Sequence, residues 1–96
     1  MKIKGKSMFD VNISIDGNRV SGKFVADSYF FESSKYYYAF YLYNGSEKID
    51  TVWYSKNMEV FFDLKDVIGD ICIQAFVKDI EHGNIRSYFS KKLESI

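Results

Sequence analysis

The 96-residue sequence contains no proline, one cysteine and one histidine, and its 13 basic and 13 acidic residues leave no net charge. Because Cys72 is the only cysteine, an intramolecular disulfide bond is excluded, and cysteine usage does not indicate a compartment. Zero net charge removes the overall field that would attract nucleic acid or an anionic membrane surface. We therefore expect no nucleic-acid partner. The sequence shows no linker, internal repeat or low-complexity tract.

A long apolar run is also missing. The stretch after Met1 is rich in lysine and lacks the apolar core of a signal peptide, and no later segment approaches the about 20 apolar residues that cross a bilayer. We expect a soluble chain without direct membrane insertion. The length predicts a single domain over residues 1–96, cut from a larger protein.

Aromatic residues, in contrast, are abundant: they make up 19% of the chain and concentrate between residues 36 and 54. An aromatic run from Tyr36 to Tyr43 is followed by Asn44-Gly45 and then by a second run that ends in Trp53-Tyr54. Asn-Gly between two such runs is typical of a tight hairpin turn, because both residues tolerate positive φ angles. The sequence therefore predicts a long β-hairpin here.

Alternation of apolar and polar residues continues along most of the chain, as expected for strands with one buried face. Turn signals such as Asp16-Gly17, Ser55–Asn57 and His82–Asn84 separate these segments. About seven short strands with turns roughly every ten residues predict an all-β fold, an immunoglobulin-like or fibronectin type III-like antiparallel β-sandwich.

Because successive side chains of a strand point to opposite faces of the sheet, the aromatic residues divide between two faces. In the hairpin, Tyr38, Phe40, Leu42 and Trp53 are expected in the core. Tyr37, Tyr41 and Tyr43 are expected on the outer face, together with Phe76 from a later strand and, depending on the register of the last strand, Tyr88. Strands three, six and seven of a sandwich share a sheet, so these outer rings are expected to form one aromatic surface. The predicted ligand-binding residues are Tyr37, Tyr41, Tyr43, Phe76 and Tyr88.

Between residues 36 and 90, the chain carries a pattern that comprises Tyr38 to Tyr43, Asn44-Gly45, Lys48 to Asp50, Trp53 to Ser55, Asn57, Phe62, Leu64, Gly69, Ala75 to Asp79 and Gly83-Asn84. This pattern resembles the triple-tyrosine domain family, small bacterial immunoglobulin-like modules found in two-component regulators and in surface or polysaccharide-related proteins. The resemblance implies an accessory interaction or ligand-sensing unit without enzymatic activity or cofactor, on the extracytoplasmic side of a bacterial envelope protein. Where the family has Gly-x-Tyr, this chain has Gly69-Asp70-Ile71, so Ile71 is expected to be a core residue.

The residues suggest no catalytic constellation or metal site. His82 lacks the further nitrogen ligands of a metal site or the nucleophile of a triad, and is expected in a solvated turn. Cys72 has no CxxC partner or basic cluster and is expected to be a small, partly buried apolar residue. Carboxylates near strand ends would suit calcium or a glycosidase pair, but the Asp-x-Asp-x-Asp-Gly run of a calcium loop is missing. These residues are expected to cap and solubilise turns: Asp63, Asp66, Asp70 and Asp79.

Three interpretations of the aromatic surface remain open. An aromatic platform with nearby amides such as Gln74 suits the apolar face of a sugar ring, and it equally suits a protein partner or neighbouring domain. Cross-strand ring pairs also stiffen a sheet without any ligand. We expect a non-catalytic accessory module that contacts a protein or a neighbouring domain. A carbohydrate-binding module attached to a polysaccharide-active enzyme is the alternative.

Overall fold

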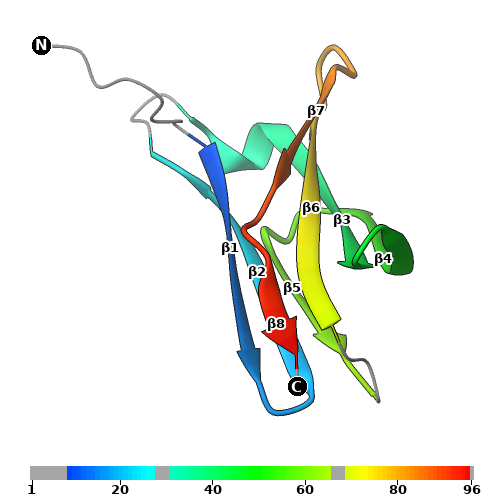
Figure 1. Ribbon diagram of the computed structural model, residues 1–96. Coiled ribbons are helices and arrows are strands. Elements are labelled where there is room, and N and C mark those ends of the chain that lie inside the picture. The colour runs from blue at the N-terminus through cyan, green and yellow to red at the C-terminus, as the bar shows by residue number, and fades with distance from the viewer. Residues whose placement is uncertain (1–8, 28–30, 66–68, 96) are drawn as a thin grey trace, which may run out of the picture.

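The computed structural model describes residues 9–27, 31–65 and 69–95, and this part of the chain is built from strands and one 3₁₀ turn, η1 (Ser33–Lys35) (Figure 1). The predicted all-β class is confirmed. The strands are β1 (Phe9–Asp16), β2 (Arg19–Ala26), β3 (Tyr36–Asn44), β4 (Glu47–Ser55), β5 (Glu59–Asp63), β6 (Gly69–Asp79), β7 (Ile85–Phe89) and β8 (Leu93–Ser95).

Two antiparallel sheets face each other as a sandwich. The three-stranded sheet has the order β1-β2-β5, and the five-stranded sheet has the order β4-β3-β6-β7, with β8 also pairing with β6. Strand β6 is long enough for two partners: β7 pairs with residues 74–78 and β8 with residues 69–71. As predicted, the third, sixth and seventh strands lie in one sheet (Figure 1).

The core lies between the sheets and is built from the residues that alternation assigned to the inner faces. Tyr38, Phe40 and Leu42 are at most 1% exposed, and Ile71 and Ile73 are fully buried. The expectations that the hairpin contributes Tyr38, Phe40 and Leu42 to the core, and that Ile71 is a core residue, are confirmed. Val20 and Phe24 meet them from the three-stranded sheet.

The hairpin predicted for residues 36 to 54 is present as β3 and β4, which extends to Ser55, but its loop is shifted by one position. Asn44 still pairs with Glu47, so the loop residues are Gly45 and Ser46, with Gly45 at φ 63°. A positive φ is sterically easy only for glycine, so Gly45 occupies the first loop position and Asn44 stays in the strand. The β1–β2 hairpin repeats this arrangement, with Gly17 at φ 63°.

The assignment of Trp53 to the core is wrong. Tyr38 pairs with Ser55 and Phe40 with Val52, so two residues of β4, Trp53 and Tyr54, lie opposite the single residue Ala39. Because Val52 lies opposite the inner-face residue Phe40, the next residue of the strand, Trp53, lies on the outer face. The other register shift, between Leu42 and Tyr43, leaves Ile49 without a residue opposite it. Ile49 packs against the core, so alternation counted from Ile49 does not extend to Trp53. Trp53 is 66% exposed.

Candidate functional site

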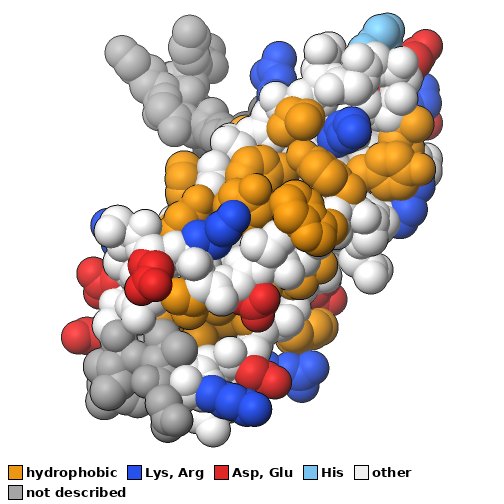
Figure 2. Space-filling view, turned by 90° about the vertical axis from the view of Figure 1, so that its right-hand side faces the viewer, with side chains coloured by type: hydrophobic (Ala, Val, Ile, Leu, Met, Phe, Trp, Pro, Cys, Tyr) orange, Lys and Arg blue, Asp and Glu red, His pale blue; other side chains and the backbone are white. Residues whose placement is uncertain are grey.

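The outer face of the five-stranded sheet carries a continuous group of aromatic rings, which we call the aromatic surface. Four of the five predicted site residues, Tyr37, Tyr41, Tyr43 and Phe76, lie on this face, from the adjacent strands β3 and β6. Figure 2 views the molecule from this side and shows a band of apolar side chains with Lys and Arg side chains among and around them. The aromatic surface comprises Tyr37, Tyr41, Tyr43, Trp53, Phe76 and Phe89.

Tyr88, the fifth predicted residue, does not belong to this surface. It pairs with Ala75, a core residue, so its side chain lies on the inner face of β7, where its ring contacts Phe9 and Phe24 at centroid distances of 5.6 Å each. The register of β7 places Phe89 outside instead, opposite Gln74 and 59% exposed. Neighbouring strand residues point to opposite faces, so a register one residue different exchanges Tyr88 for Phe89.

Sequence reasoning missed Trp53 and Phe89, the two most exposed rings of the surface. The outward position of Trp53 has no signal in the local sequence, because it follows from the register in which β4 pairs with β3. For Phe89, the adjacent Tyr88-Phe89 pair offers one aromatic residue to each face. The alternation of β7 alone therefore leaves open which ring points outward.

Tyr41 is the centre of the surface. Its ring centroid lies 4.6 Å from that of Phe76 and 6.3 Å from those of Trp53 and Tyr43, in all three cases edge to face. Tyr43 in turn lies 6.2 Å from Phe89. The rings thus form an unbroken path across the sheet from β4 to β7. Such pairs favour a fixed mutual arrangement of the rings. This order reduces the conformational entropy that the side chains would lose when a partner binds.

Lysine side chains cover part of this surface. The Nζ of Lys48 lies 4.2 Å from the ring centroid of Tyr41, and that of Lys56 lies 5.2 Å from Tyr37. Lys78 lies 5.5 Å from the ring of Tyr54. Burial, and then the neighbouring Tyr41, raise the pKa of Tyr54 above its usual value. These cation–π contacts place positive charge beside the rings.

Polar groups on the same face are partly engaged. The Tyr43 hydroxyl donates a hydrogen bond of 2.9 Å to the Gln74 side-chain oxygen, which fixes the amide between the rings of β3 and β6. At the far end of the sheet, Asp70 pairs with Glu94, so carboxylates collect there.

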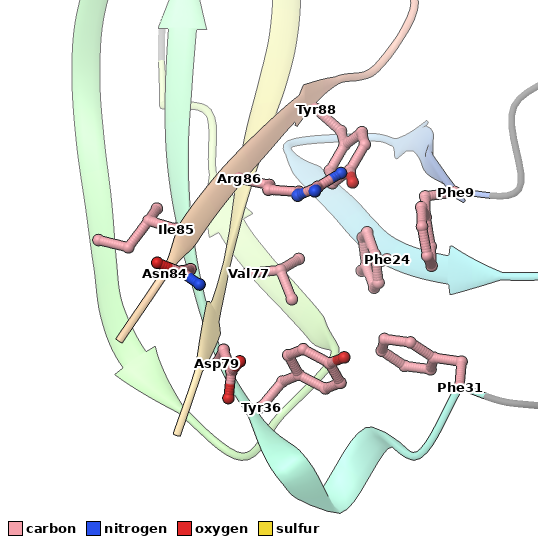
Figure 3. Close-up of a pocket in the computed structure, with 10 residues that line it drawn as sticks. All are labelled: Phe9, Phe24, Phe31, Tyr36, Val77, Asp79, Asn84, Ile85, Arg86 and Tyr88. Atoms are coloured by element: carbon pink, nitrogen blue, oxygen red, sulfur yellow. The ribbon is translucent and has the colours of Figure 1, made fainter. Parts of the chain in front are cut away.

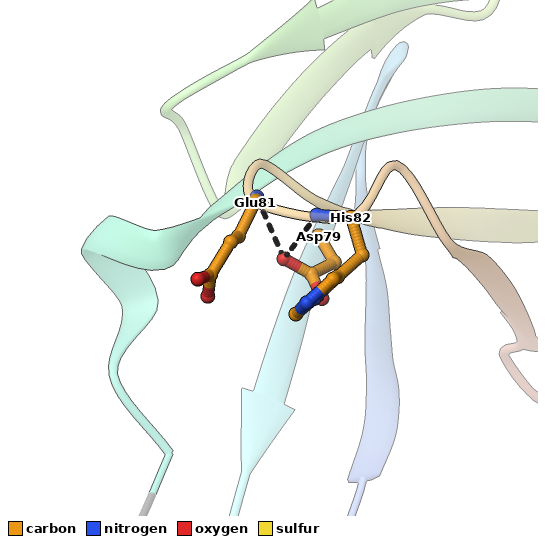
Figure 4. A network of polar contacts seen from close by, with 3 residues as sticks. All are labelled: Asp79, Glu81 and His82. Carbon is orange, nitrogen blue, oxygen red and sulfur yellow. Dashed lines mark hydrogen bonds and ion pairs between the residues drawn. The ribbon is translucent and has the colours of Figure 1, made fainter.

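His82 lies at the tip of the β6–β7 hairpin, where it was predicted, and it contacts Asp79 (Figure 4). Its Nδ1 is 3.0 Å from Asp79 Oδ2, while Asp79 Oδ1 accepts bonds of 2.8 and 3.3 Å from the backbone N–H groups of Glu81 and His82. The His82 side chain, followed by these N–H groups, holds the pKa of Asp79 below its usual value. This arrangement fits a turn that Asp79 closes.

Cys72 is buried at 7% exposure, deeper than its expected partial burial. Its Sγ lies 3.3 Å from the Ser90 backbone oxygen, and the Ser90 hydroxyl accepts a 2.9 Å hydrogen bond from the Ile73 N–H. The thiol thus helps to hold the segment after β7 against β6.

Two absences hold for the residues that the structure describes. Among them, no group of three or more His, Cys, Asp or Glu side chains is placed to hold a metal ion. Asp66 lies outside the described residues. No helix in the described part of the chain is long and apolar enough to cross a membrane.

Comparison of the chain with protein-family models, curated proteins and solved structures gives no match. The resemblance to the triple-tyrosine family therefore stays a prediction. What the geometry defines is the class: an antiparallel β-sandwich with an aromatic surface on its larger sheet.

Proposed function

We propose that this chain is a non-catalytic binding module that contacts a protein or a neighbouring domain through the aromatic surface. The proposal is supported above all by the exposure of Trp53 and Phe89, which are 66% and 59% exposed at the two ends of one connected group of rings. Tyr, Trp and Phe are enriched where protein interfaces are fully buried, and Trp and Tyr often supply most of the binding energy.

The breadth of the surface favours a protein partner. Trp53 lies on β4 and Phe89 on β7, the outermost strands in the order β4-β3-β6-β7. With neighbouring strands about 4.8 Å apart, these strands are separated by roughly 14 Å. Ile85 extends the apolar area along β7 at 54% exposure. A surface of this width, with lysines beside the rings, suits a partner with apolar and acidic groups.

The geometry of Tyr41 weighs against the carbohydrate-binding alternative. A sugar ring stacks on an open aromatic face. Lys48 Nζ lies over the Tyr41 ring, and the contacts to Phe76, Trp53 and Tyr43 surround the rest of it. The Tyr41 ring therefore offers no open face for stacking. We further propose, from the triple-tyrosine resemblance, that the module works in a bacterial sensor or surface protein.

Site-specific photo-crosslinking tests the proposal in the protein that carries this domain, in its own cells. p-Benzoylphenylalanine in place of Phe89 is expected to yield a discrete cross-linked product, which Trp53→Ser reduces at least about tenfold, as for an interface hot spot. Phe61 is the matched control position, because it is 50% exposed on the outer face of the other sheet. Equal cross-linking from positions 61 and 89, or none from position 89, would contradict the proposal.

Binding to an array of glycans tests the carbohydrate-binding alternative. The isolated domain is expected to be retained on no glycan. Retention that Trp53→Ser abolishes and Phe61→Ser preserves would instead establish the carbohydrate-binding function. Both replaced rings are exposed, so neither change removes a core side chain. Circular dichroism of the two variants serves as the folding control.

A further inference from the structure

A second site lies between the two sheets, at the end of the sandwich where β1 begins and β6 ends. A pocket of about 540 Å³ opens there, within the range of about 300 to 1,000 Å³ typical of small-ligand sites (Figure 3). Both sheets and the connection between them contribute to its walls. The pocket is separate from the aromatic surface, which lies on the outer face of the five-stranded sheet.

The walls are largely aromatic. Phe9 and Phe24 line the pocket from the three-stranded sheet, Tyr88 lines it from β7, and Phe31 and Tyr36 come from the segment before and at the start of β3. Phe31 and Tyr36 are stacked, with centroids 4.8 Å apart and planes at 11°. Phe9 lies 5.6 Å from both Phe31 and Tyr88. These rings present a preformed apolar site for a flat molecule.

One cation reaches this pocket. Arg86 pairs with Val77, a core residue, so its side chain leaves β7 on the inner face, beside Tyr88 and toward the three-stranded sheet (Figure 3). Among the described residues, no carboxylate lies within ion-pair distance of Arg86. A guanidinium without a carboxylate neighbour offers parallel N–H donors that match the two oxygens of a ligand carboxylate.

Asp79 also lines the pocket but is committed elsewhere. Both of its oxygens are bound at the β6–β7 turn, Oδ1 by the N–H groups of Glu81 and His82 and Oδ2 by the His82 ring. It therefore does not neutralise Arg86. Inside the pocket, the arrangement is aromatic on most sides and positive on one.

We propose that this pocket binds a small aromatic carboxylate, with its ring between the aromatic walls and its carboxylate paired with Arg86. The rings select a flat apolar body, and Arg86 selects the anion over its neutral analogue. An inward-pointing charge on an edge strand such as β7 also discourages pairing with a foreign strand. Protection of the edge strand needs no ligand, so binding measurements distinguish it from a role of Arg86 in ligand binding.

The test uses indole-3-acetate, its neutral analogue indole-3-acetamide and the aliphatic acid decanoate as probes. In titrations followed by ¹⁵N-edited NMR, indole-3-acetate is expected to shift the amides of Tyr36, Val77 and Tyr88, and to bind at least about tenfold more tightly than the amide. Arg86→Gln is expected to reduce the affinity for the acid to that of the amide. Arg86→Lys keeps the charge but loses the fork of donors, so an intermediate affinity is expected.

Arg19→Gln is the matched control. Arg19 is an exposed arginine of the three-stranded sheet, and its guanidinium lies over the ring of Phe61 in the same sheet, 4.4 Å from the ring centroid. It should leave binding unchanged. Arg86 is also exposed, and equal melting temperatures would show that Arg86→Gln folds. The proposal is overturned if no probe binds up to its solubility limit, if acid and amide bind equally, if Arg86→Gln changes nothing, or if the shifts map to Trp53. Tighter binding of decanoate than of indole-3-acetate would contradict the aromatic class.

Discussion

Tyr38 combines the two demands that a buried tyrosine makes on its surroundings. Its ring is fully buried and lies 5.7 Å from the Phe24 ring, between the sheets, while its hydroxyl donates a 3.0 Å hydrogen bond to the Ser33 backbone oxygen. The side chain thereby ties the η1 turn to the core. Burial raises the pKa of Tyr38 from 10.0 to about 12.

Replacement of Tyr38 by phenylalanine tests this arrangement. At pH 7, Tyr38→Phe is expected to lower the free energy of unfolding by about 1 kcal/mol, because the hydrogen bond is lost and the ring remains. The raised pKa means that the folded state holds the phenolic proton more tightly than the unfolded state does. The stability that this difference in proton binding contributes is therefore complete below pH 10, and it is lost as the pH rises toward 12.

Urea denaturation of both proteins at pH 7 and pH 11 provides the measurement. The stability difference between wild type and Tyr38→Phe should shrink at pH 11, because only the wild type has this phenol to ionise. A difference that stays constant between the two pH values would contradict the assigned cause.

At the scale of the residue, the sequence predicted most of the core and most of the site. Tyr38, Phe40 and Leu42 follow from simple alternation along one unbroken strand. Trp53 and Tyr88 were assigned to the wrong faces because their positions depend on the registers of β4 and of β7 against their neighbours. Both are properties of strand pairing, which local sequence determines only weakly.

At the scale of the elements, the two sheets approach each other closely at Gly22 of β2. A Cβ at this position would lie 2.5 Å from the Ile73 Cδ1 and 3.3 Å from the Val60 Cγ1. Ile73, on β6 of the opposite sheet, is fully buried and cannot move into solvent. A methyl group at position 22 would therefore force the Ile73 side chain to shift within the core.

A double-mutant cycle measures this contact. Gly22→Ala is expected to destabilise the fold by about 1 to 3 kcal/mol through overpacking, and Ile73→Val by about 0.5 to 1.5 kcal/mol through the lost methyl group. The combined variant should lose less than the sum, because valine lacks the Cδ1 that the new methyl would strike.

Ile71→Val provides the control for this cycle. Ile71 is equally buried on β6, but it is not among the nearest neighbours that a methyl group at position 22 would meet. Its cost should add to that of Gly22→Ala. Free energies from urea denaturation suffice for both cycles. Full additivity of Gly22→Ala and Ile73→Val would contradict the close approach.

For the whole molecule, the strand order determines how folding proceeds. Strand β2 pairs with β5 and β3 with β6, so segments far apart in sequence must meet before either sheet is complete. Folds dominated by such pairings fold in roughly milliseconds to seconds. The sequence contains no proline, so the isomerisation phase of about 10 to 100 s that proline causes is not expected.

Stopped-flow refolding from urea, followed by Trp53 fluorescence, tests this expectation. The main phase should be complete within seconds. A double-jump experiment, in which the time spent unfolded is varied, should leave the amplitudes unchanged. A phase of tens of seconds that grows with unfolding time would contradict the prediction.

The sequence by itself determined the all-β class, the hairpin of β3 and β4 and the inner faces of β3 and β6, because the period-two pattern is written locally along each strand. The tertiary structure alone decided that Trp53 and Phe89 complete the aromatic surface and that Tyr88 and Arg86 turn inward beside a pocket. These outcomes depend on how strands pair and how far one sheet covers the other. Both arise from contacts between distant segments, which no local pattern contains.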